Sequence, residues 1–242
     1  MIDPAWDEGV ERILVVIAHP DDVDFGAAGS VAAWTDRGIE VSYCVVTDGD
    51  AGGFDPEVPR SEIGGIRRAE QTAAASHVGV TDLEFLGYPD GRVEVTLGLR
   101  RDISRTIRRV RPQRVVTQSP ERNIARIYAS HPDHLATGEA TLCAVYPDAR
   151  NPFAHPDLAE EGWQAWTVRE VWMMASSGVA DRFVDITDVA DRKVKALLSH
   201  ESQHQDPDRM EPLIRDWGAA IGKLAELPEG GLAEGFVRVE TG

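Results

Sequence analysis

The chain has 242 residues and a net charge of −16, with 25 Lys and Arg against 41 Asp and Glu. This length fits one large α/β domain over residues 1–242. The charge argues against nucleic acid or an anionic membrane as a partner, because both would repel the protein. The two cysteines, Cys44 and Cys143, lie in apolar stretches and lack the spacing of a disulfide framework or a metal site.

The N-terminal residues do not combine a basic region with an apolar core, and no apolar run approaches the length of a membrane span. We therefore expect no signal peptide, no membrane partner and a cytoplasmic location.

Apolar strands that alternate with helical segments predict an α/β fold with a mostly parallel sheet. The run over residues 13–17 is continuous and β-branched, which is typical of a strand buried on both faces. A helix over 26–37 and a strand over 39–47 complete a βαβ unit. No GxGxxG motif follows the first strand, so we expect no dinucleotide site. Further strands are predicted at 80–86, 114–118, 168–175, 182–186 and 235–239, and further helices at 61–78, 97–110, 131–145, 188–202 and 210–227.

The first strand runs into Ala18-His19-Pro20-Asp21-Asp22. In open α/β sheets the carboxyl ends of the strands bind ligands. His19 and Asp22 are close enough along a turn to hold one cation, and imidazole with carboxylate is an ordinary zinc ligand set. Asp21 is then free to act as a base. The alternative is that both aspartates only cap the next helix, because Asp is a favoured N-cap residue.

A second cluster, His131-Pro132-Asp133-His134, follows the strand at 114–118 and the loop at 119–130. Proline suits the first turn of a helix, and residues three apart share a helix face. Both imidazoles can therefore point into one site, which strengthens the metal hypothesis over simple capping.

Four further features are open to more than one interpretation. The glycines of the loop Asp48–Gly53 permit close approach to a ligand but also suit a flexible loop. Asp90 follows a strand and can contact substrate, although Pro-Asp-Gly is a sufficient turn signal by itself. His200 and His204 lie four apart and can form a metal pair, but HExxH is absent and solvated or substrate-edge positions are the favoured interpretation. The five arginines of the helix at 97–110 could bind phosphate, but the negative charge of the chain and the lack of interleaved aromatic residues favour a solvated face.

The two histidine motifs together resemble the LmbE/PIG-L family of zinc-dependent N-deacetylases, which remove acetyl groups from N-acetylglucosamine-containing molecules. The resemblance covers most of the chain in the right order, because it extends to Thr47–Gly49, Arg67–Glu70, Leu86–Gly91 and Ser199–Gln203. It implies a Rossmann-like three-layer sandwich with a mostly parallel central sheet, and a small-molecule N-acetylated sugar as substrate.

Site residues follow from the same resemblance. It implies that the Zn²⁺ ligands are His19, Asp22 and His134, with Fe²⁺ as an alternative metal. Asp21 is the implied general base, and His131 stabilises the developing oxyanion or protonates the departing amine. Asp133 is implied to orient His131. Substrate contacts are expected from Asp48, Arg67 and Asp90.

This sequence departs from the family pattern at two places. Val23 follows the aspartate pair, and Asp24 stands where Glu is common. Members that make mycothiol have a tyrosine two positions before the first histidine of the second motif. Here that position is Ala129, with Tyr128 beside it.

Three other functions would also use parts of this pattern. An amidase that cleaves a larger acyl group, such as that of a thiol conjugate, would use the same chemistry. A receiver-like signalling domain also has an acidic pair after its first strand, but it binds magnesium, which prefers oxygen ligands and would leave His19 and His134 without a role. A non-catalytic sugar-binding relative is expected to lack the base or a ligand, and none is missing here. Some relatives form homo-oligomers, but the sequence shows no interface.

Overall fold

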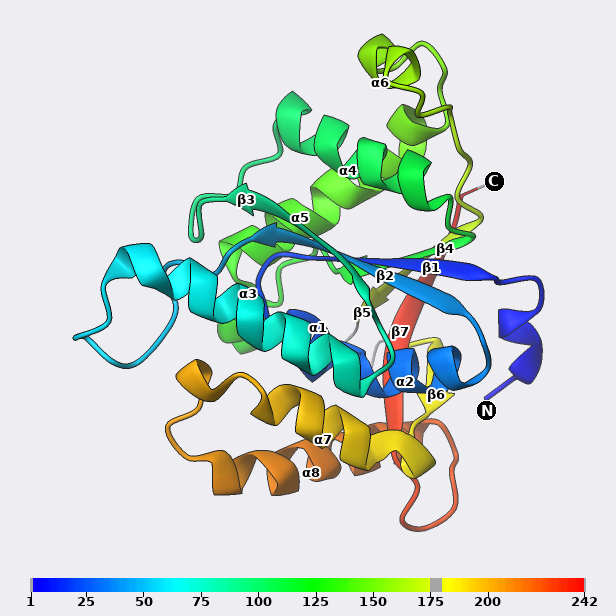
Figure 1. Ribbon diagram of the computed structural model, residues 1–242. Helices are drawn as coiled ribbons and strands as arrows, with labels where there is room; N and C mark the ends of the chain where they lie inside the picture. Colours follow the sequence, from blue (N-terminus) through cyan, green and yellow to red (C-terminus); the bar gives the residue numbers. More distant parts are fainter. Residues whose placement is uncertain (1, 175–179, 242) are drawn as a thin grey trace.

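The computed structural model describes residues 2–174 and 180–241, which form a layered α/β fold (Figure 1). Within these residues seven strands make one sheet in the order β3-β2-β1-β4-β5-β7-β6. The neighbours from β3 to β5 are parallel, and β7 is antiparallel to both β5 and β6. The strands are β1 (Arg12–Ile17), β2 (Glu40–Thr47), β3 (Asp82–Tyr88), β4 (Arg114–Gln118), β5 (Glu170–Met174), β6 (Arg182–Asp185) and β7 (Ala233–Glu240). The predicted α/β class and mostly parallel sheet are confirmed.

Helices cover both faces of the sheet, with α4 and α5 on one side and α1, α2, α3, α7 and α8 on the other (Figure 1). Their bounds are α1 (Asp22–Gly26), α2 (Ala28–Asp36), α3 (Arg60–His77), α4 (Leu97–Val110), α5 (Pro132–Cys143), α6 (Pro156–Glu160), α7 (Ala190–Leu198) and α8 (Met210–Leu224). Across the described residues, none of these helices has the length and apolar character that a bilayer span requires.

Strand β1, which lies between β2 and β4, contacts both helical layers. Ile13, Val15 and Ile17 pack into the core on the side of α2, whereas Leu14 and Val16 pack into the core on the side of α4. All five side chains are fully buried. A strand buried on both faces must be continuously apolar, which is the pattern of this segment. The residues that follow β1 are consequently held at the middle of the sheet edge.

Several predicted boundaries are wrong for local reasons. The helix expected over 26–37 is α2, which spans Ala28–Asp36, because Gly26 belongs to the separate short helix α1 and the backbone breaks at Ala27. Gly87 and Tyr88, predicted as a turn, belong to β3, because a register shift pairs Tyr88 with Thr47. The helix expected over 188–202 ends at Leu198. Ala175, the predicted end of the fifth strand, lies outside the described residues.

Candidate metal centre and active site

The three predicted metal ligands converge beyond the carboxyl ends of β1 and β4. Nδ1 of His19 lies 3.2 Å from Nε2 of His134 and 3.4 Å from Oδ2 of Asp22. Nε2 of His134 lies 3.0 Å from Oδ1 of Asp22. Ligand atoms bound tetrahedrally to zinc at about 2.0–2.1 Å lie about 3.3 Å apart. The donor types and their spacing therefore fit a single zinc-like cation.

Local hydrogen bonds explain why these side chains meet. The backbone N–H of Ala18 donates to Oε1 of Gln118 at 2.9 Å, which ties the end of β1 to the end of β4. The N–H of His19 donates to Oδ2 of Asp22 at 2.7 Å and closes the turn after Pro20. His131 caps α5, so that His134 lies in its first turn.

His19 is the centre of the acidic cluster. Its Nε2 lies 3.1 Å from Oδ1 of Asp90 and 3.2 Å from Oδ2 of Asp133. Burial alone would lower the pKa of His19, but the charge of Asp22 and hydrogen bonds to Asp133, Asp22 and Asp90 outweigh it and raise the pKa to about 12. Three carboxylates around one imidazole create an excess of negative charge that suits a divalent cation.

Ligand atoms within 4.8 Å of one another form two further groups, and both contain His19. One group adds His131 and His134, and the other adds Asp90 and Asp133.

The Asp133 carboxylate has a different partner from the one expected. It accepts hydrogen bonds from the N–H groups of Gly91 at 2.7 Å and Val93 at 3.2 Å, in addition to its contact with His19. Burial would raise the pKa of Asp133, but its hydrogen bond with His19, followed by those from Gly91 and Val93, lowers the pKa below its usual value. His131 is instead held by the backbone N–H of Asp133, which donates to its Nδ1 at 3.2 Å. The expected orientation of His131 by the Asp133 carboxylate is therefore corrected.

Asp21, the predicted base, lies beside the ligands and is held by α3. Nη2 of Arg67 donates to Oδ2 of Asp21 at 3.0 Å and also to the carbonyl of Pro20. Arg67 is 3 % exposed. Burial raises the pKa of Asp21 to about 7, although the charge of Arg67 opposes this rise. The Asp21 side chain makes no capping hydrogen bond, so capping does not explain it.

Two glycines after β2 allow the loop to cover Arg67. A Cβ atom at Gly52 would meet the Arg67 guanidinium and would lie 2.9 Å from Oε1 of Gln203. A Cβ atom at Gly49 would lie 3.0 Å from Nη1 of Arg67, and its φ is +64°. Close packing, rather than loop flexibility, therefore explains glycine at these two positions.

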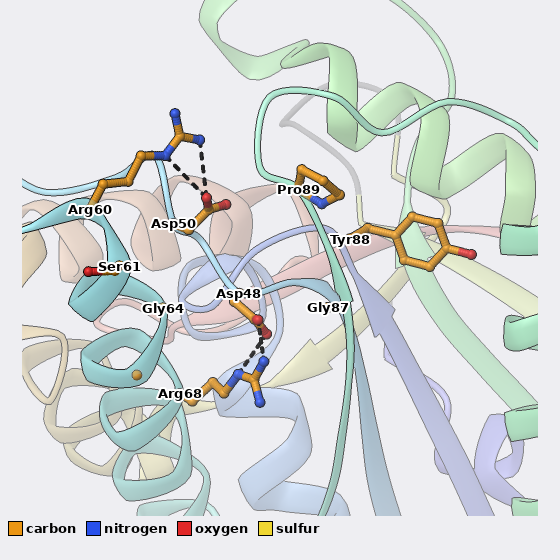
Figure 2. Close-up of a pocket in the computed structure, with 10 residues that line it drawn as sticks. Asp48, Asp50, Arg60, Ser61, Gly64, Arg68, Gly87, Tyr88 and Pro89 are labelled. Carbon is orange, nitrogen blue, oxygen red and sulfur yellow. Dashed lines mark hydrogen bonds and ion pairs between the residues drawn. The ribbon is translucent and has the colours of Figure 1, made fainter.

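A hollow of about 400 Å³ lies between α3 and the end of β3 (Figure 2). Two ion pairs line it, one between Arg68 and Asp48 and one between Arg60 and Asp50. Oδ1 of Asp50 accepts a hydrogen bond from the N–H of Asp90 at 3.0 Å, which connects the hollow to the His19 cluster. The other lining residues are Ser61, Gly64 and Gly65 of α3 and Gly87, Tyr88 and Pro89 at the end of β3.

The three residues expected to contact substrate thus have distinct environments. Asp90 contacts His19, Arg67 forms an ion pair with Asp21, and Asp48 lines the hollow and forms an ion pair with Arg68. Whether they touch substrate stays a prediction. The side chain of Tyr128 lies outside the described residues.

His200 and His204 have separate partners. His200 is fully buried, and its Nε2 lies 2.8 Å from Oδ2 of Asp24. Nε2 of His204 lies 2.9 Å from the carbonyl of Leu197. The solvated or substrate-edge position expected for His200 is wrong.

Fold and site together define a class, the Rossmann-like α/β proteins with a cluster of histidines and carboxylates at the carboxyl edge of the sheet that could hold a metal ion. The sequence matches the model of the PIG-L family, GlcNAc-PI de-N-acetylase, over residues 14–145, and the chain belongs to this family. Both histidine motifs lie inside the matched residues, so the resemblance drawn from them is confirmed. Family membership argues against the receiver-like alternative.

Several proteins similar to this chain are deacetylases. It is 31 % identical over 218 residues to the diacetylchitobiose deacetylase of Thermococcus kodakarensis, covering 89 % of this chain and 79 % of the relative. It is 35 % identical to a probable N-acetyl-alpha-D-glucosaminyl L-malate deacetylase 2 of Bacillus anthracis, covering 62 % of this chain and 70 % of that one. The solved N,N′-diacetylchitobiose deacetylase from Pyrococcus horikoshii superposes with a TM-score of 0.89 at 27 % identity, covering 98 % of this chain and 86 % of that chain. This similarity confirms the predicted fold.

Proposed function

We propose that this protein is a metal-dependent hydrolase that removes the N-acetyl group from an N-acetylglucosamine unit of a small molecule. The observation that carries the proposal is the convergence of His19, Asp22 and His134 with Asp21 beside them. Deacetylase relatives that act on diacetylchitobiose support the sugar substrate. Two imidazoles and one carboxylate favour zinc as the ion, with Fe²⁺ as the alternative.

The residues around this centre meet the needs of amide hydrolysis. A divalent cation bound by His19, Asp22 and His134 would polarise the amide carbonyl and lower the pKa of water. Asp21 adjoins Asp22 in the chain and accepts the proton that the attacking water loses. The His131 ring, whose centroid lies 4.8 Å from that of His19, protonates the departing amine or stabilises the developing oxyanion.

The hollow beside Asp90 supports a substrate with more than one hydroxylated unit. Each of its two arginines is paired with an aspartate, so its lining offers donors and acceptors without a net positive charge. Hydroxyl groups both donate and accept hydrogen bonds. The hydroxyl groups of a second sugar or a polyol can therefore hydrogen-bond to these arginines and aspartates.

The test is acetate release by the zinc-loaded protein from N-acetylglucosamine, its disaccharides, its malate and inositol glycosides, and acylated thiol conjugates. We expect acetate from at least one glycoside. Asp21→Asn should keep its metal and lose turnover by about 10²- to 10⁴-fold. Asp188→Asn, the same change at an exposed position, is the matched control.

Two results would contradict the proposal. Activity that survives in Asp21→Asn would remove Asp21 as the base. Release of a larger acyl group, with no acetate from any glycoside, would establish the amidase instead. Organisation as one domain, a cytoplasmic location and a homo-oligomeric state remain proposals; limited proteolysis, cell fractionation and light scattering test them.

A further inference from the structure

A buried pair of polar side chains, His200 and Asp24, joins the C-terminal part of the chain to α1. The two residues are 176 positions apart, and both side chains are fully buried. Nε2 of His200 faces Oδ2 of Asp24 at 2.8 Å, so Nε2 carries the proton and donates it. His200 lies outside residues 14–145, the part of the chain that matches the family model.

Gln71 of α3 connects this pair to the predicted base. Its Nε2 donates to Oδ2 of Asp24 at 2.9 Å, and its Oε1 accepts the backbone N–H of Asp21 at 2.7 Å. Gln71 is fully buried. A carboxylate only accepts and an N–H only donates, so these two partners fix the orientation of the Gln71 amide.

The hydrogen bond from Asp21 to Gln71 lies at a backbone position with an unusual conformation. The φ of Asp21 is +91°, in the left-handed region that residues with a side chain seldom adopt. Such a conformation persists only where the surroundings hold it. Gln71 holds the Asp21 backbone and Arg67 holds its carboxylate.

Stability alone does not explain a histidine and an aspartate at this place. Within the described residues, Oδ1 of Asp24 and Nδ1 of His200 are buried without a hydrogen-bond partner. Buried polar atoms left without partners are unfavourable, and an apolar pair of similar volume would avoid that penalty.

We propose that Asp24 and His200 are positioning residues that act through Gln71 to hold Asp21 in its left-handed conformation beside the metal centre. This inference rests on the proposed function, because it takes Asp21 as the base.

The test compares His200→Leu, which removes the donor, with His200→Gln, which keeps one. In His200→Leu we expect kcat for acetate release to fall about 10- to 100-fold, with KM and metal content per chain unchanged. His200→Gln should recover most of kcat. His204→Leu is the matched control, because it removes a neighbouring histidine that bonds to the Leu197 carbonyl, and it should keep kcat.

A second set of variants tests the route through Gln71. Gln71→Leu should lower kcat as His200→Leu does, and the double variant should lose little more than either single variant. If His200→Leu does not fold, the other two variants still test the proposal. It requires that His200→Gln is active and that Gln71→Leu has a lowered kcat.

An equal fall in kcat in His200→Leu and His204→Leu would overturn the proposal. So would a double variant whose fall in kcat is the product of the two single falls, or a fall in kcat that accompanies loss of metal. If the wild type releases no acetate, the proposed function itself fails. If the wild type is active and His200→Leu is folded and equally active, only this inference fails.

Discussion

Replacing Arg67 by methionine tests how the predicted base is held. Arg67 and Arg68 are adjacent in α3, but the Arg67 side chain is 4 % exposed and pairs with Asp21, whereas that of Arg68 is 49 % exposed and pairs with Asp48. Methionine fills much of the arginine volume and donates no hydrogen bond. Arg67→Met therefore leaves the Asp21 carboxylate without its cationic partner.

The expected losses of stability differ because the Arg67–Asp21 pair is buried and Arg68 is exposed. Removing one partner of a buried pair costs about 3–5 kcal/mol. The Asp21 side chain is 18 % exposed, so the lower end, about 3 kcal/mol, applies. An exposed pair such as that of Arg68 contributes about 0–1 kcal/mol. In a chain of this size 1 kcal/mol lowers Tm by about 2–4 °C. We expect a fall in Tm of about 6–12 °C for Arg67→Met and at most about 4 °C for Arg68→Met.

Calorimetric unfolding of both variants at equal metal content measures these shifts, and acetate release measures their activity. Arg67→Met should also lower kcat, because the Asp21 carboxylate is no longer fixed. Arg67→Lys, which keeps the charge but loses the planar fork, should lie between Arg67→Met and the wild type. Equal Tm shifts in the two methionine variants, or an unchanged Tm in Arg67→Met, would refute the reasoning.

Three further predictions follow from the same structure. His134→Gln should lose the bound ion, which elemental analysis measures; a full equivalent of metal in this variant would count against the ligand set. Gly52→Ala should lower kcat, because its methyl group would displace the Arg67 guanidinium. Unchanged kinetics would show that the loop moves instead and leaves the Arg67–Asp21 pair in place. Burial alone would raise the pKa of Glu170, but Arg114 and Arg238 outweigh it and lower the pKa below its usual value of 4.5. These ion pairs therefore stabilise the fold above about pH 4.5 and lose their effect as pH falls through the lowered pKa, so the Tm difference between the wild type and Glu170→Gln should shrink in acid; a constant difference would contradict this.

The convergence of the three proposed metal ligands could be predicted because it depends on local pattern and parallel topology. His19 and Asp22 follow β1 directly, and His134 lies in the first turn of the helix after β4. β1 and β4 are parallel neighbours, so their carboxyl ends lie side by side. Motifs that follow adjacent parallel strands therefore reach the same edge of the sheet.

The partners of the other site residues could not be predicted, because they depend on packing between distant segments. His200 meets Asp24 only when α7 packs beside α1, and Asp133 meets the backbone of Gly91 only when the loop after β3 closes over α5. The arginines of α4 show the same limit. Arg108 was expected on a solvated face, but it is buried and donates to backbone carbonyls in residues 148–154.

The most direct test of the account is titration of the metal-free protein with Zn²⁺ while acetate release from an N-acetylglucosamine disaccharide is followed. We expect activity to rise to a plateau at one ion per chain and to stay absent in His134→Gln at the same ion concentrations. Full acetate release by the metal-free protein, or equal release by His134→Gln, would contradict it.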